Sequence, residues 1–137
     1  MDPTEQFNLY LNGLNLQIDS DINFLLVDKP EEYIALTGGK IYYPIDRYDE
    51  LDLVPVEYDV REASPLKIII SMLEFYNQPL SKANIDYYIH TDDVLYKELL
   101  ERYQEGETVR LKDAMYGLRF VEGLAPYEDG YILLLGS

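Results

Sequence analysis

Cysteine and tryptophan are absent from this chain, and histidine occurs once, as His90. The absence of cysteine excludes disulfide bonds, thiolate nucleophiles and every cysteine-based zinc or iron-sulfur site. With one histidine, a zinc site within one chain would need carboxylates for nearly all of its ligands. We therefore expect packing alone to hold the fold, with no metal and no cofactor.

Long apolar runs are missing too. No segment approaches the roughly 18 uninterrupted apolar residues of a membrane span, and residues 1–5 lack the basic and then apolar layout of a signal peptide. We therefore expect a cytoplasmic protein that does not contact membranes. The length of 137 residues is close to the commonest domain size, so a single domain is predicted over residues 1–137.

Basic residues are scarce: 11 Lys and Arg stand against 26 Asp and Glu, which gives a formal net charge of −15. Residues 1–60 carry a net −10 and residues 61–137 a net −5. Such a protein repels nucleic acid and anionic membranes and attracts a partner with a basic surface. Two interpretations stay open, namely a charge that only keeps the protein soluble and an acidic contact surface.

Helical patterns are strongest in the middle of the chain. Ser64 and Pro65 begin a helix that is apolar on both sides and runs to Tyr76. Ser81 and Thr91 are suited to cap two further helices, the second of which closes near residue 106. Two shorter helices are expected at residues 3–13 and 29–36.

Strands are expected on both sides of these helices, at residues 14–18, 22–27, 40–43, 108–111, 118–121 and 131–135, with Pro44 ending the third. The order predicts an α+β fold in which a central helical cluster, at about 64–105, packs with short antiparallel strands from both ends of the chain. A winged-helix-like arrangement fits the same order. Its third helix carries more acids than bases, which argues against direct nucleic-acid binding.

No motif argues for catalysis, so we expect no enzyme. The run Thr37-Gly38-Gly39-Lys40 lacks the first glycine and the final Ser or Thr of a phosphate-binding P-loop. No Gly-x-Ser-x-Gly nucleophile elbow occurs, and the paired aspartates lack the spacing of a calcium loop.

Residues 44–63 differ from their surroundings, because carboxylates alternate with apolar residues and two prolines prevent a long helix. We expect an exposed loop or an edge strand. Its acids and two of its tyrosines make up the predicted partner-binding set: Asp46, Tyr48, Asp49, Glu50, Asp52, Glu57, Tyr58, Asp59 and Glu62.

The function predicted from these residues is protein binding. Duplex DNA carries about one negative charge per 1.7 Å of axis, so a regular row of carboxylates can occupy a cleft built to hold DNA. We expect an acidic module that engages the basic nucleic-acid-binding surface of a partner enzyme and inhibits it. This is similar in character to virus-encoded inhibitors of nucleases, restriction enzymes or CRISPR effectors, and to immunity proteins. The alternative is a structural or assembly subunit of a virion or other large complex.

Overall fold

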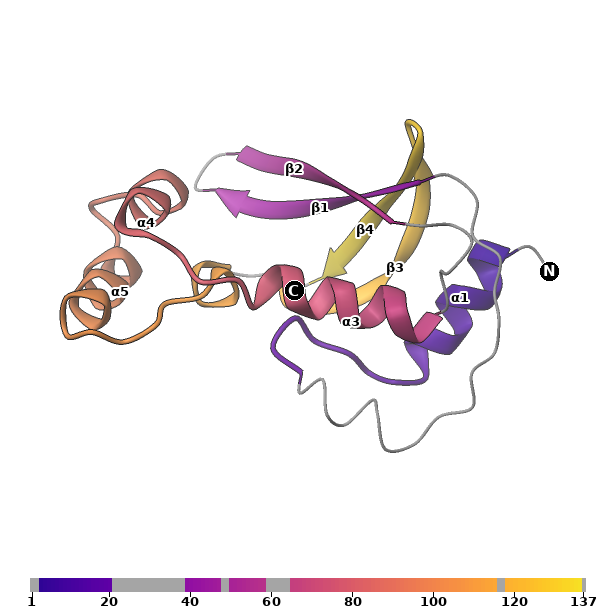
Figure 1. The fold of residues 1–137 in the computed structure, drawn as a ribbon, viewed down its shortest axis with the longest axis horizontal. Helices are drawn as coiled ribbons and strands as arrows, with labels where there is room; N and C mark the ends of the chain where they lie inside the picture. Colours follow the sequence, from indigo (N-terminus) through magenta and orange to yellow (C-terminus); the bar gives the residue numbers. More distant parts are fainter. Residues whose placement is uncertain (1–2, 21–38, 48–49, 59–64, 116–117, 137) are drawn as a thin grey trace.

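The computed structural model describes residues 3–20, 39–47, 50–58, 65–115 and 118–136 (Figure 1). The helices are α1 (Pro3–Asn12), α3 (Pro65–Tyr76), α4 (Lys82–Tyr88) and α5 (Val94–Gln104), with a short 3-10 helix η1 (Leu111–Ala114). The strands are β1 (Lys40–Arg47), β2 (Glu50–Glu57), β3 (Phe120–Tyr127) and β4 (Gly130–Gly136). They form one sheet in the order β2-β1-β4-β3, which confirms the α+β class. No helix among the described residues is long and apolar enough to cross a membrane.

The sheet consists of two antiparallel hairpins, β1–β2 and β3–β4, that are joined in parallel through β1 and β4. The parallel contact is short: Ile41 pairs with Tyr131, and Tyr42 pairs with Ile132. The expectation of antiparallel pairing is therefore confirmed within each hairpin and wrong between the hairpins. Parallel strands need a long connection, and here the intervening helices carry the chain back in the same direction.

Pro44 and Pro55 lie inside strands, so the prediction that Pro44 ends β1 is wrong. The backbone N–H of Tyr58 donates to the carbonyl of Gly39 (2.9 Å), and hydrogen-bonded pairs alternate along an antiparallel ladder. This alternation places both prolines at positions whose nitrogen faces away from the other strand of the β1–β2 hairpin, so no bond of that hairpin is lost. The carbonyl of Pro44 accepts a hydrogen bond from the hydroxyl of Tyr76 in α3 (2.8 Å).

The inner face of the sheet, which carries Ile41, Tyr43 and Ile45 of β1, is buried against α1 and α3. Figure 1 shows α3 running along the sheet. The Tyr43 ring stacks on Phe75 of α3 with centroids 4.5 Å apart and meets Tyr76 edge-on at 6.0 Å. These aromatic contacts fix how α3 lies against β1.

The outer face of the sheet carries Lys40, Glu57 and Glu122 but also many apolar residues. Side chains alternate along a strand, so the strand pairings place these apolar residues on the side opposite the core: Tyr42, Leu51, Leu53, Pro55, Phe120, Ala125, Tyr127, Ile132 and Leu134. None of them belongs to the packed core cluster. Leu51 is 51% exposed, Phe120 47% and Leu134 40%.

Helices α4 and α5 form a lobe (residues 81–106) at one end of the molecule, while α3 alone lies along the sheet (Figure 1). Ser81 caps α4 as predicted, in a capping box with Asn84. Thr91 does not cap α5. Asp93 does, because its carboxylate accepts the N–H of Leu95 (2.9 Å). The winged-helix-like arrangement and the single domain over 1–137 stay predictions.

Two predicted strands are only isolated bridges. In place of a strand at 14–18, Leu16 and Ile18 exchange backbone hydrogen bonds with Val121 and Arg119 at the edge of β3. In place of a strand at 108–111, one bridge pairs Arg110 with Pro79 before η1 begins. The strand and helix predicted at 22–27 and 29–36, and the Ser64 cap, lie outside the described residues.

The outer edge of β3 is closed by one side chain of α1. The Asn8 amide donates to the Leu124 carbonyl (3.0 Å) and accepts the Leu124 N–H (2.8 Å), as a neighbouring strand would. Gly123 makes the approach possible, since a Cβ at this position would lie 2.7 Å from the Asn8 Oδ1. Its positive φ of 156° also favours glycine.

Asn8→Ala is expected to lower the free energy of unfolding in urea by about 1–3 kcal/mol, because it leaves the buried Leu124 backbone groups unsatisfied. Gly123→Ala is expected to cost a similar amount by displacing Asn8. In the Asn8→Ala background, Gly123→Ala should cost less, since the clash is gone.

Gly39→Ala is the control for this cycle, because a Cβ at Gly39 meets nothing within 4 Å. Full additivity of the Asn8 and Gly123 substitutions would contradict the proposed contact.

Candidate functional site

The β1–β2 hairpin carries five of the nine predicted partner-binding residues. Asp46 lies on β1, Glu50, Asp52 and Glu57 lie on β2, and Tyr58 follows β2 directly. The remaining four lie outside the described residues: Tyr48, Asp49, Asp59 and Glu62. As expected, β2 is an edge strand of the sheet.

The hairpin separates these residues into two groups. Asp46 pairs with Leu51 close to the turn, and Asp52 is one residue further along β2. Glu57 lies five residues beyond Asp52, about 17 Å away at the usual rise of a strand. The described members of the predicted set therefore lie toward opposite ends of β2, and a role of the whole set in partner binding stays a prediction.

Asp52 connects the turn end of the hairpin to the lobe. Its half-exposed carboxylate accepts a hydrogen bond from the Tyr87 hydroxyl of α4 (3.3 Å). Tyr87 remains 53% exposed. Figure 1 shows the end of β1 and the start of β2 beside α4, so Asp52 and the lobe lie at one end of the molecule.

Glu57 and Tyr58 belong to a different environment. Glu57 is exposed and pairs across the ladder with Lys40, whose ammonium binds Asp129 (2.9 Å). Tyr58 is half-buried against the core, and burial raises the pKa of its hydroxyl to about 12. Its position is that of a packing residue.

Asp129 fastens β1 to the β3–β4 turn. Its carboxylate accepts hydrogen bonds from the Tyr42 hydroxyl (2.6 Å) and from Lys40. The hydrogen bonds from Tyr42 and then Lys40 hold the pKa of Asp129 below its ordinary value. Tyr42 also meets Tyr127 edge-on, with centroids 4.9 Å apart.

A row of carboxylates runs along α5. Glu98, Glu101 and the C-cap residue Glu105 are all exposed, and spacings of three and four residues put them on one face of the helix. Val94, 78% exposed, begins the same face. In the part of the chain that the structure describes, none of the three carboxylates takes part in an ion pair.

Several other acids have structural partners. Asp86 accepts hydrogen bonds from Tyr96 (2.6 Å) and Lys82 (2.9 Å), which lower its pKa. Asp19 binds Arg119 (2.9 Å). Exposed acids also lie elsewhere on the described surface, at Glu74, Glu122 and Glu128. The acidic surplus is therefore spread over the molecule, and the row along α5 is one part of it.

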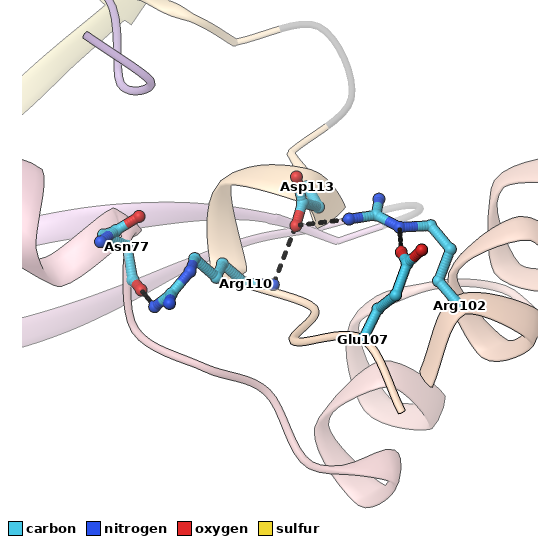
Figure 2. Close-up of polar contacts among 5 residues, drawn as sticks. All are labelled: Asn77, Arg102, Glu107, Arg110 and Asp113. Atoms are coloured by element: carbon cyan, nitrogen blue, oxygen red, sulfur yellow. Dashed lines mark hydrogen bonds and ion pairs between the residues drawn. The ribbon is translucent and has the colours of Figure 1, made fainter. Parts of the chain in front are cut away.

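The lobe is attached through a neck, which we define as residues 77–80 and 107–113. The Leu80 N–H donates to the backbone carbonyl of Val109 (2.7 Å), and the Leu111 N–H donates to the backbone carbonyl of Gln78 (2.9 Å). These two hydrogen bonds join the two segments of the neck. Figure 2 shows the polar contacts that surround them.

Two arginines complete the neck (Figure 2). Arg102 of α5 binds Glu107 (2.8 Å) and lies 3.7 Å from Asp113, while Arg110 donates to the carbonyl of Asn77 (2.7 Å). Asp113 also accepts the N–H of Arg110 (2.9 Å). Sequence patterns do not reveal this network, because its members are up to 36 residues apart and no periodicity relates them.

No metal-binding group of three or more His, Asp or Glu side chains occurs among the described residues. His90 Nδ1 accepts the backbone N–H of Asp92 (3.2 Å), an ordinary contact after the end of α4. Comparison of the chain with models of known protein families, with curated proteins and with solved structures finds no match.

Asp129→Asn is expected to reduce the loss of stability in acid. A carboxylate with a lowered folded-state pKa stabilises the fold above its unfolded pKa of about 3.9, and this contribution disappears as the pH falls through the folded value. Unfolding measured from neutral pH to about pH 2 should therefore show a flatter acid limb in the variant. Glu128→Gln, in the same turn, is the control and should keep the wild-type limb.

Arg102→Met is expected to loosen the lobe, because it removes the contacts to Glu107 and Asp113. The half-exposed pair contributes no more than about 1 kcal/mol. Hydrogen exchange should rise in α4 and α5 and stay unchanged in β1 and β4. Lys97→Met is the control on the same helix, and equal changes in both variants would contradict a role for the neck.

Proposed function

We propose that this protein is a binding module, not an enzyme, that occupies the basic nucleic-acid-binding surface of a partner enzyme and inhibits it. The acidic surface consists of Glu98 and Glu101 of α5 and of Glu105, the residue that caps the C-terminus of this helix. The observation that carries this proposal is the row on α5, whose carboxylates are exposed and form no ion pair among the described residues. A virus or another mobile element is a fitting source for such an inhibitor.

The charge density of the row supports this choice of partner. Seven residues of helix separate Glu98 from Glu105, a length of about 10.5 Å at 1.5 Å per residue. One strand of duplex DNA carries a charge about every 3.4 Å of axis, hence about three over the same length. The spacing of these carboxylates is therefore similar to the spacing of the phosphates along one DNA strand, so they fit a groove whose cations are placed to bind that strand.

Apolar contacts support a protein partner. Electrostatic attraction steers association, whereas buried aromatic and aliphatic side chains supply most of the affinity at protein interfaces. Val94 lies on the same helix face as the carboxylates, and Tyr87 is exposed between α4 and Asp52. Both are placed to contact a protein that approaches the acids.

A structural or assembly subunit is the second candidate. The apolar outer face of the sheet favours it, because Leu51, Phe120 and Leu134 expose large side chains there. Exposed apolar patches of this kind are typical of interaction sites.

The proposal predicts that the triple variant Glu98→Gln, Glu101→Gln, Glu105→Gln binds its partner at least about tenfold more weakly, since three charge contacts are lost. Glutamine keeps the helix propensity, so α5 should remain folded. Immobilised protein is exposed to an extract of the source cells at low salt and eluted with a salt gradient. The eluted nucleic-acid-binding enzyme is then assayed for inhibition and for competition by duplex DNA.

The matched control is Glu74→Gln, Glu122→Gln, Glu128→Gln, which changes the net charge equally but leaves α5 intact. It should bind and inhibit like the wild type. Equal loss in both triple variants would show that only net charge matters, and a captured partner whose binding resists salt would contradict the acidic surface.

A further inference from the structure

The main contacts of the lobe with the rest of the molecule lie at two places. One is the neck, which continues from α3, and the other is the end of the β1–β2 hairpin beside α4 (Figure 1). We propose that the lobe is a hinged unit that turns about the neck and is held closed by a latch. The latch is the hydrogen bond from the Tyr87 hydroxyl of α4 to the Asp52 carboxylate of β2 (3.3 Å).

The lobe has the internal contacts of a unit that moves as one piece. Ile85 of α4 and Leu99 of α5 are almost fully buried, and α4 contacts α5 more extensively than it contacts β1. The Tyr96 hydroxyl of α5 donates to the Asp86 carboxylate of α4 (2.6 Å), which joins the two helices at the surface. The capping box at Ser81 fixes the start of α4. Opening of the latch therefore changes the position of the lobe and leaves its own packing intact.

The neck has the features of a hinge. The backbone hydrogen bonds of Leu80 and Leu111 keep its two segments together. Arg102 of α5 binds Glu107 of the neck (2.8 Å), so the C-terminal end of α5 stays close to the neck. Gly106 follows this end with a positive φ of 88°, and a Cβ there would meet nothing within 4 Å, so the backbone has room to turn. The pivot is therefore at the C-terminal end of α5, away from the latch.

The latch is the weaker of the two attachments. Both of its side chains are partly exposed, Tyr87 by 53%, so water competes for the hydroxyl and for the carboxylate. A hydrogen bond between two such side chains has a small net effect on stability. Proteins open locally where burial is least, so the lobe should separate from the hairpin while the neck stays paired.

Opening of the lobe redirects the carboxylates of α5. Because Glu98 and Glu101 belong to the lobe, its rotation changes the direction in which they face while the sheet stays in place. The use of this motion in binding rests on the proposed function, because a basic groove would select the lobe orientation that brings the carboxylates onto its cations. The hinge itself is a property of the free protein and needs no partner.

A distance measured by pulsed electron paramagnetic resonance tests the hinge. The chain has no cysteine, so spin labels attach only at Lys97→Cys on α5 and Ser71→Cys on α3, both exposed and outside the latch and the neck. With the latch intact, one distance should dominate. Tyr87→Phe keeps the ring but removes the donor, so it should raise the share of a second distance about threefold, as one partly exposed hydrogen bond allows. Asp52→Ala should act likewise, and the two changes together should add little.

Tyr103→Phe is the matched control, because it removes the hydroxyl of another exposed tyrosine of the lobe and should leave the distances unchanged. Near-ultraviolet circular dichroism of the tyrosines checks that each variant is folded. Unchanged distances in either latch variant overturn the proposal, and so does an equal change in Tyr103→Phe. Because no partner is present, a negative result here leaves the inhibitor proposal standing, and a failed inhibition assay leaves the hinge standing.

Discussion

The pairing of β1 with β4 is the constraint on which the rest of the structure depends. Only two residue pairs join the hairpins in parallel, yet this contact makes one sheet from strands that lie on either side of the helices in the sequence. Burial of Ile41 and Tyr131 supports it from the inner side, and the hydrogen bonds of Asp129 support it at the strand ends. Pro44 then limits its length, because it has no N–H to offer a continued ladder.

The two faces of this sheet differ in composition. The inner face is filled by α1 and α3, and the buried Tyr76 hydroxyl donates to the carbonyl of Pro44. The outer face combines apolar residues such as Leu51, Phe120 and Leu134 with charged ones, because Lys40 and Glu57 lie on it and the Glu122 carboxylate lies over Gly136.

Local patterns predicted the elements whose cause is local. Ser81 with Asn84 marks a helix start through a capping box, and the apolar run from Pro65 to Tyr76 marks a buried helix. The prediction that Pro44 ends its strand is wrong. A proline interrupts a strand only at a position where a backbone N–H would bind the neighbouring strand, and the register of the two strands, which decides this, cannot be seen in the local sequence. For the same reason the pattern of residues 44–63 predicts one set of acids, although Asp52 and Glu57 lie toward opposite ends of β2.

The candidate surfaces were predicted only in part. The acids of α5 are visible in the sequence, but the absence of ion pairs to them among the described residues depends on which acids the fold brings to the nearby bases. Arg102 is engaged by Glu107, and Lys82 by Asp86. The outer face could not be foreseen, since the alternation of residues 50–57 is compatible with either face toward the core until β1 fixes the register.

The neck has a consequence for how this molecule can change over evolutionary time. Because residues 78–80 and 109–111 are hydrogen-bonded to each other, the chain leaves and re-enters the sheet-bearing body at nearly one point. The residues between these two segments form an inserted helical lobe, and the chain of the sheet-bearing body would connect without it. A lineage can lengthen, shorten or exchange that helical pair by a single insertion or deletion, and so acquire a new binding specificity while the sheet and its buried aromatic residues stay the same.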